Sequence, residues 1–233
     1  MQYINPYIEI CLESSSSLFK GLNQKEKEVI SQHHTVTLIK KGAYLFRQGD
    51  KVRGLIYLVS GKVKVYRTGV AGREHIMNLL KANDVSGFQP ILTESVWSSS
   101  AIALEESLIC TIEKHCLLRI LRSNADISLK ISRLLSEELN SSYDKMVSLT
   151  QKHVRGRLVE SILMLVDIYG FEADGKTLKA YLSRNDMAHL SNMTTSNAIR
   201  TLSNLATEGH IKVKGRKIAI LNLANLERIS DQA

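Results

Sequence analysis

Residues 182–202 read LSRNDMAHLSNMTTSNAIRTL, and this stretch contains two helical apolar patterns separated by a short polar segment. Ser183 stands three residues before Asp186, which is the spacing of a capping box at the start of a helix. Asn192 lies in the polar segment, and Asn tolerates the left-handed backbone conformation that a tight turn requires. Thr194 can cap the second helix. The spacing therefore predicts a helix-turn-helix.

The second helix of this motif is expected to have one apolar and one polar face. The apolar residues of both helices would form a shared core: Met187, Leu190, Ala198, Ile199, Leu202 and Leu205, with the small Ala188 at the crossing. The exposed residues are polar and mostly short: Thr195, Ser196, Asn197 and Arg200. Base edges in a DNA major groove could approach such a face. We therefore expect this helix to read DNA sequence.

A basic hairpin is expected after Gly209, where the second helix should end. In the segment HIKVKGRKIAIL, Lys212 and Lys214 flank Val213 before a turn at Gly215-Arg216, and the chain then returns as a second strand. Such a hairpin would form a wing beside the helix. Half of the net charge of +8 lies between residues 182 and 217, where six Lys and Arg residues face two acidic ones. A helical hairpin that serves only as a protein contact is the alternative.

The composition is that of a soluble protein with room for one large or two small cores: 233 residues, 44% hydrophobic and 23% charged. A pI near 9.4 favours a polyanionic partner. Cys11, Cys110 and Cys116 form no Cys-x-x-Cys pair, so neither a disulfide framework nor a Cys-rich zinc site is indicated. The N-terminal stretch lacks a signal-peptide pattern, and no apolar run approaches the roughly 18 residues of a membrane span. We expect a cytoplasmic protein without a membrane partner.

Two further regions complete the expected architecture. Short strands and turns between residues 36 and 112 predict a small antiparallel barrel or roll, preceded by a helix. From Asp126 the chain has no Pro or Gly for nearly thirty residues, and apolar side chains recur every three or four positions, which predicts one long helix. This helix is longer than such a roll needs, so we expect it to pair with a second copy. The expected interface residues are Ile131, Leu135, Leu139 and Met146. A helix packed only on its own chain is the alternative.

The chain resembles the catabolite-activator/fumarate-nitrate-regulator (Crp/Fnr) family of bacterial transcription factors over nearly all of its length. The resemblance rests on KGAYLFRQGD, IYLVSGKVKVY, GREHIMNLLKANDVSGF and LSRNDMAHLSNMTTSNAIRTLSNLATEGHIKVKG. It implies an α+β fold: an N-terminal antiparallel β-roll of the cyclic-nucleotide-binding type (1–124), a long dimerisation helix (125–152) and a C-terminal winged helix-turn-helix (153–233).

The resemblance also implies DNA contacts. Thr195, Ser196 and Arg200 fall where family members contact bases, and Arg200 matches the residue that often binds a guanine. Thr195-Ser196 replaces the Arg-Glu pair of the best-known members, so their preferred half-site cannot be carried over. The whole expected DNA interface comprises Ser183, Arg184, Thr194, Thr195, Ser196, Asn197, Arg200, Lys212, Lys214 and Arg216.

The family's nucleotide pocket uses a Gly-Glu segment for the ribose and an Arg-Ser or Arg-Thr pair for the phosphate. Here these read Gly87-Phe88 and Ser99-Ser100, so both charged anchors are missing and neither cyclic AMP nor cyclic GMP is the expected effector. Phe88, with Trp97 nearby, suits a less polar ligand or simply fills the space. The expected effector pocket comprises Gly87, Phe88, Gln89, Ser99, Ser100, Ser142 and Tyr143. Its ligand is unidentified.

Other chemistries have less support. The N-terminal Cys cluster of iron–sulfur relatives is absent, and Gln89 occupies the position of a haem-binding relative's His ligand. His33-His34 and His75 remain possible ligands, although a His in a strand or loop is more often a surface or core residue, so no metal site is assigned. No catalytic set is visible, and we expect no enzyme. We expect a homodimeric, sequence-specific DNA-binding regulator that also contacts RNA polymerase; the alternative is a ligand-binding signalling module that regulates a protein partner.

Overall fold

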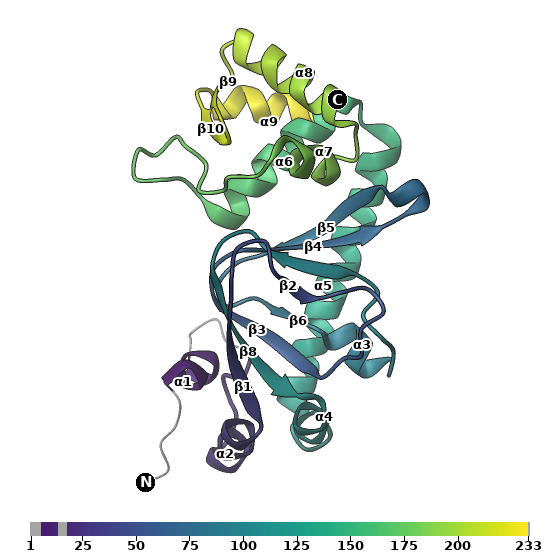
Figure 1. The fold of residues 1–233 in the computed structure, drawn as a ribbon, viewed down its shortest axis with the longest axis vertical. Helices are drawn as coiled ribbons and strands as arrows, with labels where there is room; N and C mark the ends of the chain where they lie inside the picture. Colours follow the sequence, from purple (N-terminus) through teal and green to yellow (C-terminus); the bar gives the residue numbers. More distant parts are fainter. Residues whose placement is uncertain (1–5, 14–17, 233) are drawn as a thin grey trace. The chain divides into compact units, whose positions relative to one another are not determined.

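The structure, a computed structural model, describes residues 6–13 and 18–232 (Figure 1). The N-terminal stretch used above for the signal-peptide prediction lies partly outside these residues. The chain forms two compact units, Met1–Arg67 with Asn78–Asn140 and Thr68–Met77 with Ser141–Ala233. Among the described residues, no helix combines the length and apolar character needed to cross a membrane.

The first unit is built around two four-stranded sheets. Their strands are β1 (His34–Ile39), β2 (Tyr44–Phe46), β3 (Gly54–Ser60), β4 (Val63–Thr68), β5 (Glu74–Leu80), β6 (Val85–Ser86), β7 (Ser100–Ala103) and β8 (Ser107–Glu113). One sheet has the order β1-β8-β3-β6 and the other β2-β7-β4-β5. Pairing is antiparallel in β1–β8, β3–β8, β3–β6, β2–β7 and β4–β7. The predicted antiparallel β-roll is confirmed.

Strand β3 is apolar on both of its faces because each face meets a different core. Leu55 and Tyr57 pack against helices on the outside of the sheet, whereas Ile56 and Leu58 face the interior of the roll. Residues from five helices contribute to the outer core: α1 (Pro6–Glu13), α2 (Gln24–Gln32), α3 (Phe88–Leu92), α4 (Lys114–Ser123) and the first turns of α5 (Ala125–Gln151). A short 3₁₀ helix, η1 (Val70–Gly72), lies between β4 and β5.

The three cysteines are buried and reduced, as expected of small apolar core residues. Burial raises the pKa of the Cys116 thiol to about 11. The pKa of Cys11 is also raised, first by its side-chain hydrogen bond with Cys110 and then by burial. The thiols of Cys11 and Cys116 are therefore protonated near neutral pH, which makes them poor nucleophiles and poor metal ligands.

Helix α5 confirms the long helix predicted from the sequence, but its apolar stripe has two uses. Ile127 and Ile131 are at most 2% exposed and belong to the core of the first unit. The assignment of Ile131 to a dimer interface is therefore corrected, because its own chain already covers it. Leu139 and Met146, in contrast, are 51% and 60% exposed.

The second unit contains the predicted helix-turn-helix and hairpin. Its elements are α6 (Val154–Tyr169), α7 (Arg184–Leu190), α8 (Thr195–Thr207), β9 (Ile211–Lys214), β10 (Lys217–Ile220) and α9 (Leu223–Asp231), together with the last turns of α5. Met187, Ala188, Ala198, Leu202 and Leu205 are at most 2% exposed, as expected of the shared core. Ile199 is different: it is 50% exposed, so its expected core position is wrong.

Candidate nucleic-acid interface

The turn between α7 and α8 is formed by the residues that the sequence singled out. Ser183 Oγ accepts a hydrogen bond from Asp186 N at 3.0 Å, and the Asp186 carboxylate accepts one from Ser183 N at 3.2 Å. Asn192 has a φ of +49°, the left-handed conformation predicted for this turn. Thr194 then caps α8 by accepting a hydrogen bond from Asn197 N. The capping box therefore starts α7 and the Thr194 cap starts α8, with only residues 191–194 between the two helices.

Arg157 on α6 holds this turn, and the sequence analysis missed it. Its guanidinium donates to the backbone oxygens of Ser191 at 3.2 Å, Asn192 at 3.3 Å and Lys152 at 2.9 Å. One planar cation thus satisfies carbonyls at the end of α5 and in the turn. An Arg in a helix of mostly apolar residues was the available signal, but its partners in the turn are 34 and 35 residues away in the sequence and could not be identified.

A second arginine fixes the other end of α8. The Arg155 guanidinium donates two hydrogen bonds to the carboxylate of Glu208, one of them at 2.7 Å. These bonds lower the pKa of Glu208 below its ordinary value, with the Arg155 hydrogen bond as the largest cause. Both ends of α8 are therefore attached to α6 or its flanks, and its exposed face has a defined position within the second unit.

The exposed face of α8 carries four side chains suited to contacts with DNA bases. Thr195 donates a hydrogen bond to Asn185 on α7 at 2.7 Å, and Arg200 donates one to Asn197 at 3.0 Å. Ser196 and Ile199 lie exposed between them. Because Arg200 is held along the helix, less freedom is lost when it binds. Ile199 adds an apolar group to the face, and such a group suits the methyl group of thymine.

The predicted wing is present as β9 and β10, and β9 packs beside α8. Its basic side chains are exposed: Lys212, Lys214, Arg216 and Lys217. Arg184, also expected in the DNA interface, has a partner within its own unit, because its Nη2 donates to the carbonyl of Gly215 at 2.6 Å. It joins the start of α7 to the turn of the wing, so its role within the structure is to hold the wing.

We expect Lys214→Ala to reduce the salt dependence of DNA binding. Each phosphate contact that a lysine makes releases counterions, so losing one should lower the magnitude of the log–log slope by about 0.9 per chain. The measurement is the affinity for one duplex at several salt concentrations. Lys41→Ala is the matched control because Lys41 is an exposed lysine in the first unit. Equal slopes for Lys214→Ala and the unsubstituted protein would exclude Lys214 from the interface.

The expected effector pocket has an aromatic filling. Trp97 stacks on Phe46 with ring centroids 3.6 Å apart, and both rings are buried. Gly87 has a φ of +115°, and a Cβ added there would lie 3.0 Å from the Trp97 ring. The Trp97 ring therefore lies directly against the Gly87 backbone. Phe88, the residue after Gly87, is buried in the outer core.

The remaining residues of the expected effector pocket differ in burial and belong to different units. Ser100 is buried, and its Oγ accepts a hydrogen bond from Gln48 N at 3.0 Å. Gln89 is exposed, and so are Ser142 and Tyr143, which belong to the second unit. A cavity of about 1010 Å³ opens in the roll. Its lining does not consist of the residues of the expected effector pocket but includes Thr35, Thr37, Phe46, Ile56, Trp97, Ile109 and Thr111.

Comparisons with known proteins agree with both units. The family model of the cyclic nucleotide-binding domain matches residues 36–124, and that of the Crp-like helix-turn-helix domain matches residues 156–229. Electron transport regulator A of Shewanella oneidensis is 30% identical over 196 residues, which are 84% of this chain and 78% of that protein. The cyclic AMP receptor protein of Thermus thermophilus is 25% identical over 215 residues, 92% of this chain and 97% of that protein.

A similar fold occurs among solved structures. A transcriptional regulator of the Crp/Fnr family from Eubacterium rectale has a TM-score of 0.76 at 20% identity, covering 92% of this chain and 97% of that one. FixK2 from Bradyrhizobium japonicum has a TM-score of 0.75 at 20% identity, covering 84% of this chain and 96% of that one.

Proposed function

The chain belongs to the Crp/Fnr family of transcription regulators, and from this premise we propose that it is a homodimer that binds a specific site on double-stranded DNA. Members of this family are regulators and not enzymes, as predicted. The observation that carries the proposal is the face of α8, capped at Thr194 and held by Arg157 and Arg155, with the basic wing beside it. A module that regulates only a protein partner would not need this arrangement.

The proposed function is tested by selecting bound duplexes from a pool of random sequence. A dimer with one recognition helix per chain should enrich an inverted repeat whose half-sites are one helical turn, about 10 base pairs, apart. Enrichment of no sequence would contradict specific DNA binding. Enrichment of a single half-site would contradict the dimer. RNA polymerase is the further partner that we propose, and the cytoplasm is the compartment in which DNA is available to such a regulator.

We propose that the two copies pair through the outer stripe of α5. Four large apolar side chains are exposed there: Leu139, Tyr143, Met146 and Val147. Leu139 and Met146 are seven residues apart, which places them on one side of the helix two turns from each other. Such a stripe is costly to leave in water, and a second copy of the same helix covers it symmetrically.

We also propose that the effector, if small, is not a cyclic nucleotide. The support is that the Trp97 ring lies against Gly87, where the resemblance locates the ribose, and that Ser99 and Ser100 offer the phosphate no charge. Lys62, a possible substitute, pairs with Glu105 at 3.0 Å. Arg67 is a second candidate for the cation that would bind the phosphate. Its Nε donates to the backbone oxygen of Ser98, next to Ser99, at 3.0 Å.

Calorimetry with cyclic AMP and cyclic GMP is expected to give no binding heat at ligand concentrations up to about 1 mM, because a buried phosphate needs a compensating cation. The matched variant is Arg67→Ala. Micromolar binding by the unsubstituted protein that is lost in Arg67→Ala would contradict the proposal and identify Arg67 as the phosphate partner. Micromolar binding that survives the substitution would contradict it as well.

A further inference from the structure

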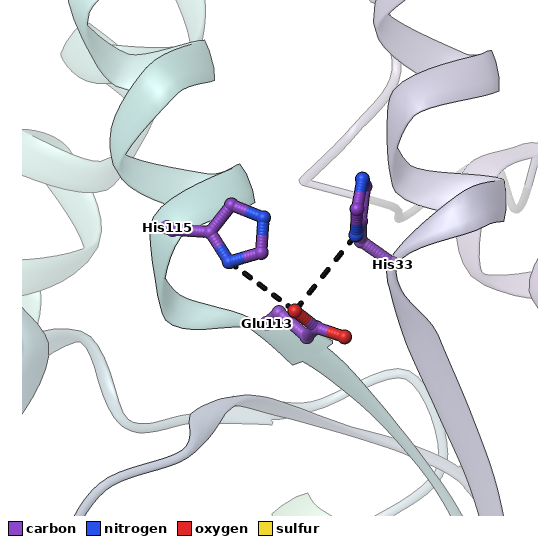
Figure 2. A group of neighbouring side chains, drawn as sticks. All are labelled: His33, Glu113 and His115. Atoms are coloured by element: carbon purple, nitrogen blue, oxygen red, sulfur yellow. Dashed lines mark ion pairs between the residues drawn. The ribbon is translucent and has the colours of Figure 1, made fainter.

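Three side chains with metal-binding atoms converge at one edge of the roll, within the first unit. They are His33, Glu113 and His115, and one ligand atom from each lies within 4.8 Å of the others (Figure 2). His115 Nδ1 is 3.2 Å from Glu113 Oε2, and His33 Nδ1 is 3.8 Å from the same oxygen. The two imidazole rings lie edge to face with centroids 4.8 Å apart.

The backbone fixes the positions of all three residues. His33 follows α2 and precedes β1, while Glu113 ends β8 and His115 lies in the first turn of α4. Strand β1 pairs with β8 from His34 opposite Ile112 to Ile39 opposite Ser107, and just beyond this ladder Glu113 N donates to His33 O at 3.1 Å. Only side-chain rotations are therefore needed to bring the ligand atoms closer.

The separations fit a tetrahedral ion. Zn–N distances of 2.0–2.1 Å and similar Zn–O distances imply about 3.3 Å between neighbouring ligand atoms. The two distances to Glu113 are already close to this value, and only the two imidazole nitrogens have to approach each other. The three side chains are 40%, 47% and 64% exposed, so the rings can turn and water can complete the coordination.

The chemistry of the set indicates the class of metal. Two imidazoles and one carboxylate suit Zn²⁺ and related first-row divalent ions, whereas Ca²⁺ and Mg²⁺ prefer oxygen ligands only. The start of α4 is the positive end of that helix and opposes a cation. The negative charge of Glu113, whose Oε2 lies 3.2 Å from His115 Nδ1 and 3.8 Å from His33 Nδ1, offsets this effect.

We propose that His33, Glu113 and His115 bind one divalent transition-metal ion of the Zn²⁺ type per chain, with water in the remaining position. The ion would join the end of α2 to the start of α4. The same two helices are already linked where Asn124, directly after α4, donates to both carboxylate oxygens of Glu26 on α2, at 3.1 and 3.2 Å. This inference is independent of the proposed DNA binding.

The test is a Zn²⁺ titration of the full, untagged chain by calorimetry, with Co²⁺ absorption spectra as a second readout of coordination. We expect one equivalent per chain and a loss of at least about tenfold in affinity in His33→Gln, Glu113→Gln and His115→Gln. His34→Gln is the matched control, because the Nδ1 of this neighbouring histidine lies 2.9 Å from Ser31 O and His34 is outside the cluster. Zn²⁺ should also raise the thermal unfolding midpoint of the unsubstituted protein and of His34→Gln.

The affinity for Zn²⁺ should fall in acid, since protons compete with the metal for its ligand atoms. Two outcomes would overturn the proposal: no saturable Zn²⁺ binding by the unsubstituted chain, or binding that all three cluster variants keep at the original affinity. Circular dichroism of each variant establishes that it is folded. If one cluster variant does not fold, the other two variants and the Co²⁺ spectrum of the unsubstituted chain test the proposal.

Discussion

Leu139→Asp combined with Met146→Asp is expected to convert the proposed dimer into a monomer. In the proposed pairing, each substitution buries an unpaired carboxylate between two α5 helices. Leaving a buried charge without a partner costs about 3–5 kcal/mol, and 1.4 kcal/mol corresponds to a tenfold change in the dissociation constant. Sedimentation velocity measures the change in mass directly. Because a monomer presents one recognition helix, it should also lose most of its affinity for a two-half-site duplex.

The choice of positions comes from the burial of the helix. Leu135 lies on the same stripe, but it packs partly against the core of the first unit, so Asp there would also weaken the fold. Leu129→Asp is the matched control because Leu129 is 52% exposed on the same helix and, at 100° per residue, lies on a different side. A dimer of unchanged affinity in the double variant would move the interface away from α5.

Local sequence signals were sufficient for the helix-turn-helix. Ser183 and Asp186 form the capping box, Asn192 adopts the left-handed conformation and Thr194 caps α8, all as predicted. Each of these features depends on residues within four positions of one another, so the spacing alone determines it. Their agreement with the apolar pattern on both sides made the motif identifiable without a structure.

Periodicity could not show what covers an apolar side chain. Ile131 and Ile199 both fall in helical apolar patterns, and both were misplaced for the same reason. The first is covered by the roll of its own chain, whereas the second faces solvent. A period of 3.6 locates a stripe on a helix, but the neighbour of that stripe is a property of the tertiary fold.

The cluster at Glu113 and the contacts of Trp97 depend on residues far apart in the sequence, so the sequence could not predict them. His33 and Glu113 are eighty positions apart in the sequence and meet only because β1 pairs with β8 in a fixed register. Trp97 was expected near the pocket, but its stack on Phe46 and its contact with Gly87 depend on the closure of the roll. The missing charged anchors were visible in the sequence, whereas the contact of the Trp97 ring with Gly87 was not.

Arg200→Ala is expected to lower the affinity for the selected duplex by about 1–3 kcal/mol and to remove the preference at one base pair of each half-site. Arg200 is exposed on α8, one turn beyond Ser196 and held by Asn197, so its guanidinium can present a pair of donors to one base. Arginine binds the two major-groove acceptors of guanine in this way. The measurement compares affinities for duplexes with each of the four base pairs at every half-site position.

Two further variants separate base reading from charge. Arg228 on α9 donates to Asn225 Oδ1 at 3.0 Å, as Arg200 does to Asn197, so Arg228→Ala removes the same charge and the same hydrogen bond at another site. It should leave the base preference unchanged. Arg200→Lys keeps the charge but loses the planar pair of donors, and should therefore restore overall affinity in part without restoring the preference. If Arg200→Ala weakened binding equally for every duplex and Arg200→Lys recovered it fully, Arg200 would be a phosphate contact and the sequence would be read elsewhere on α8.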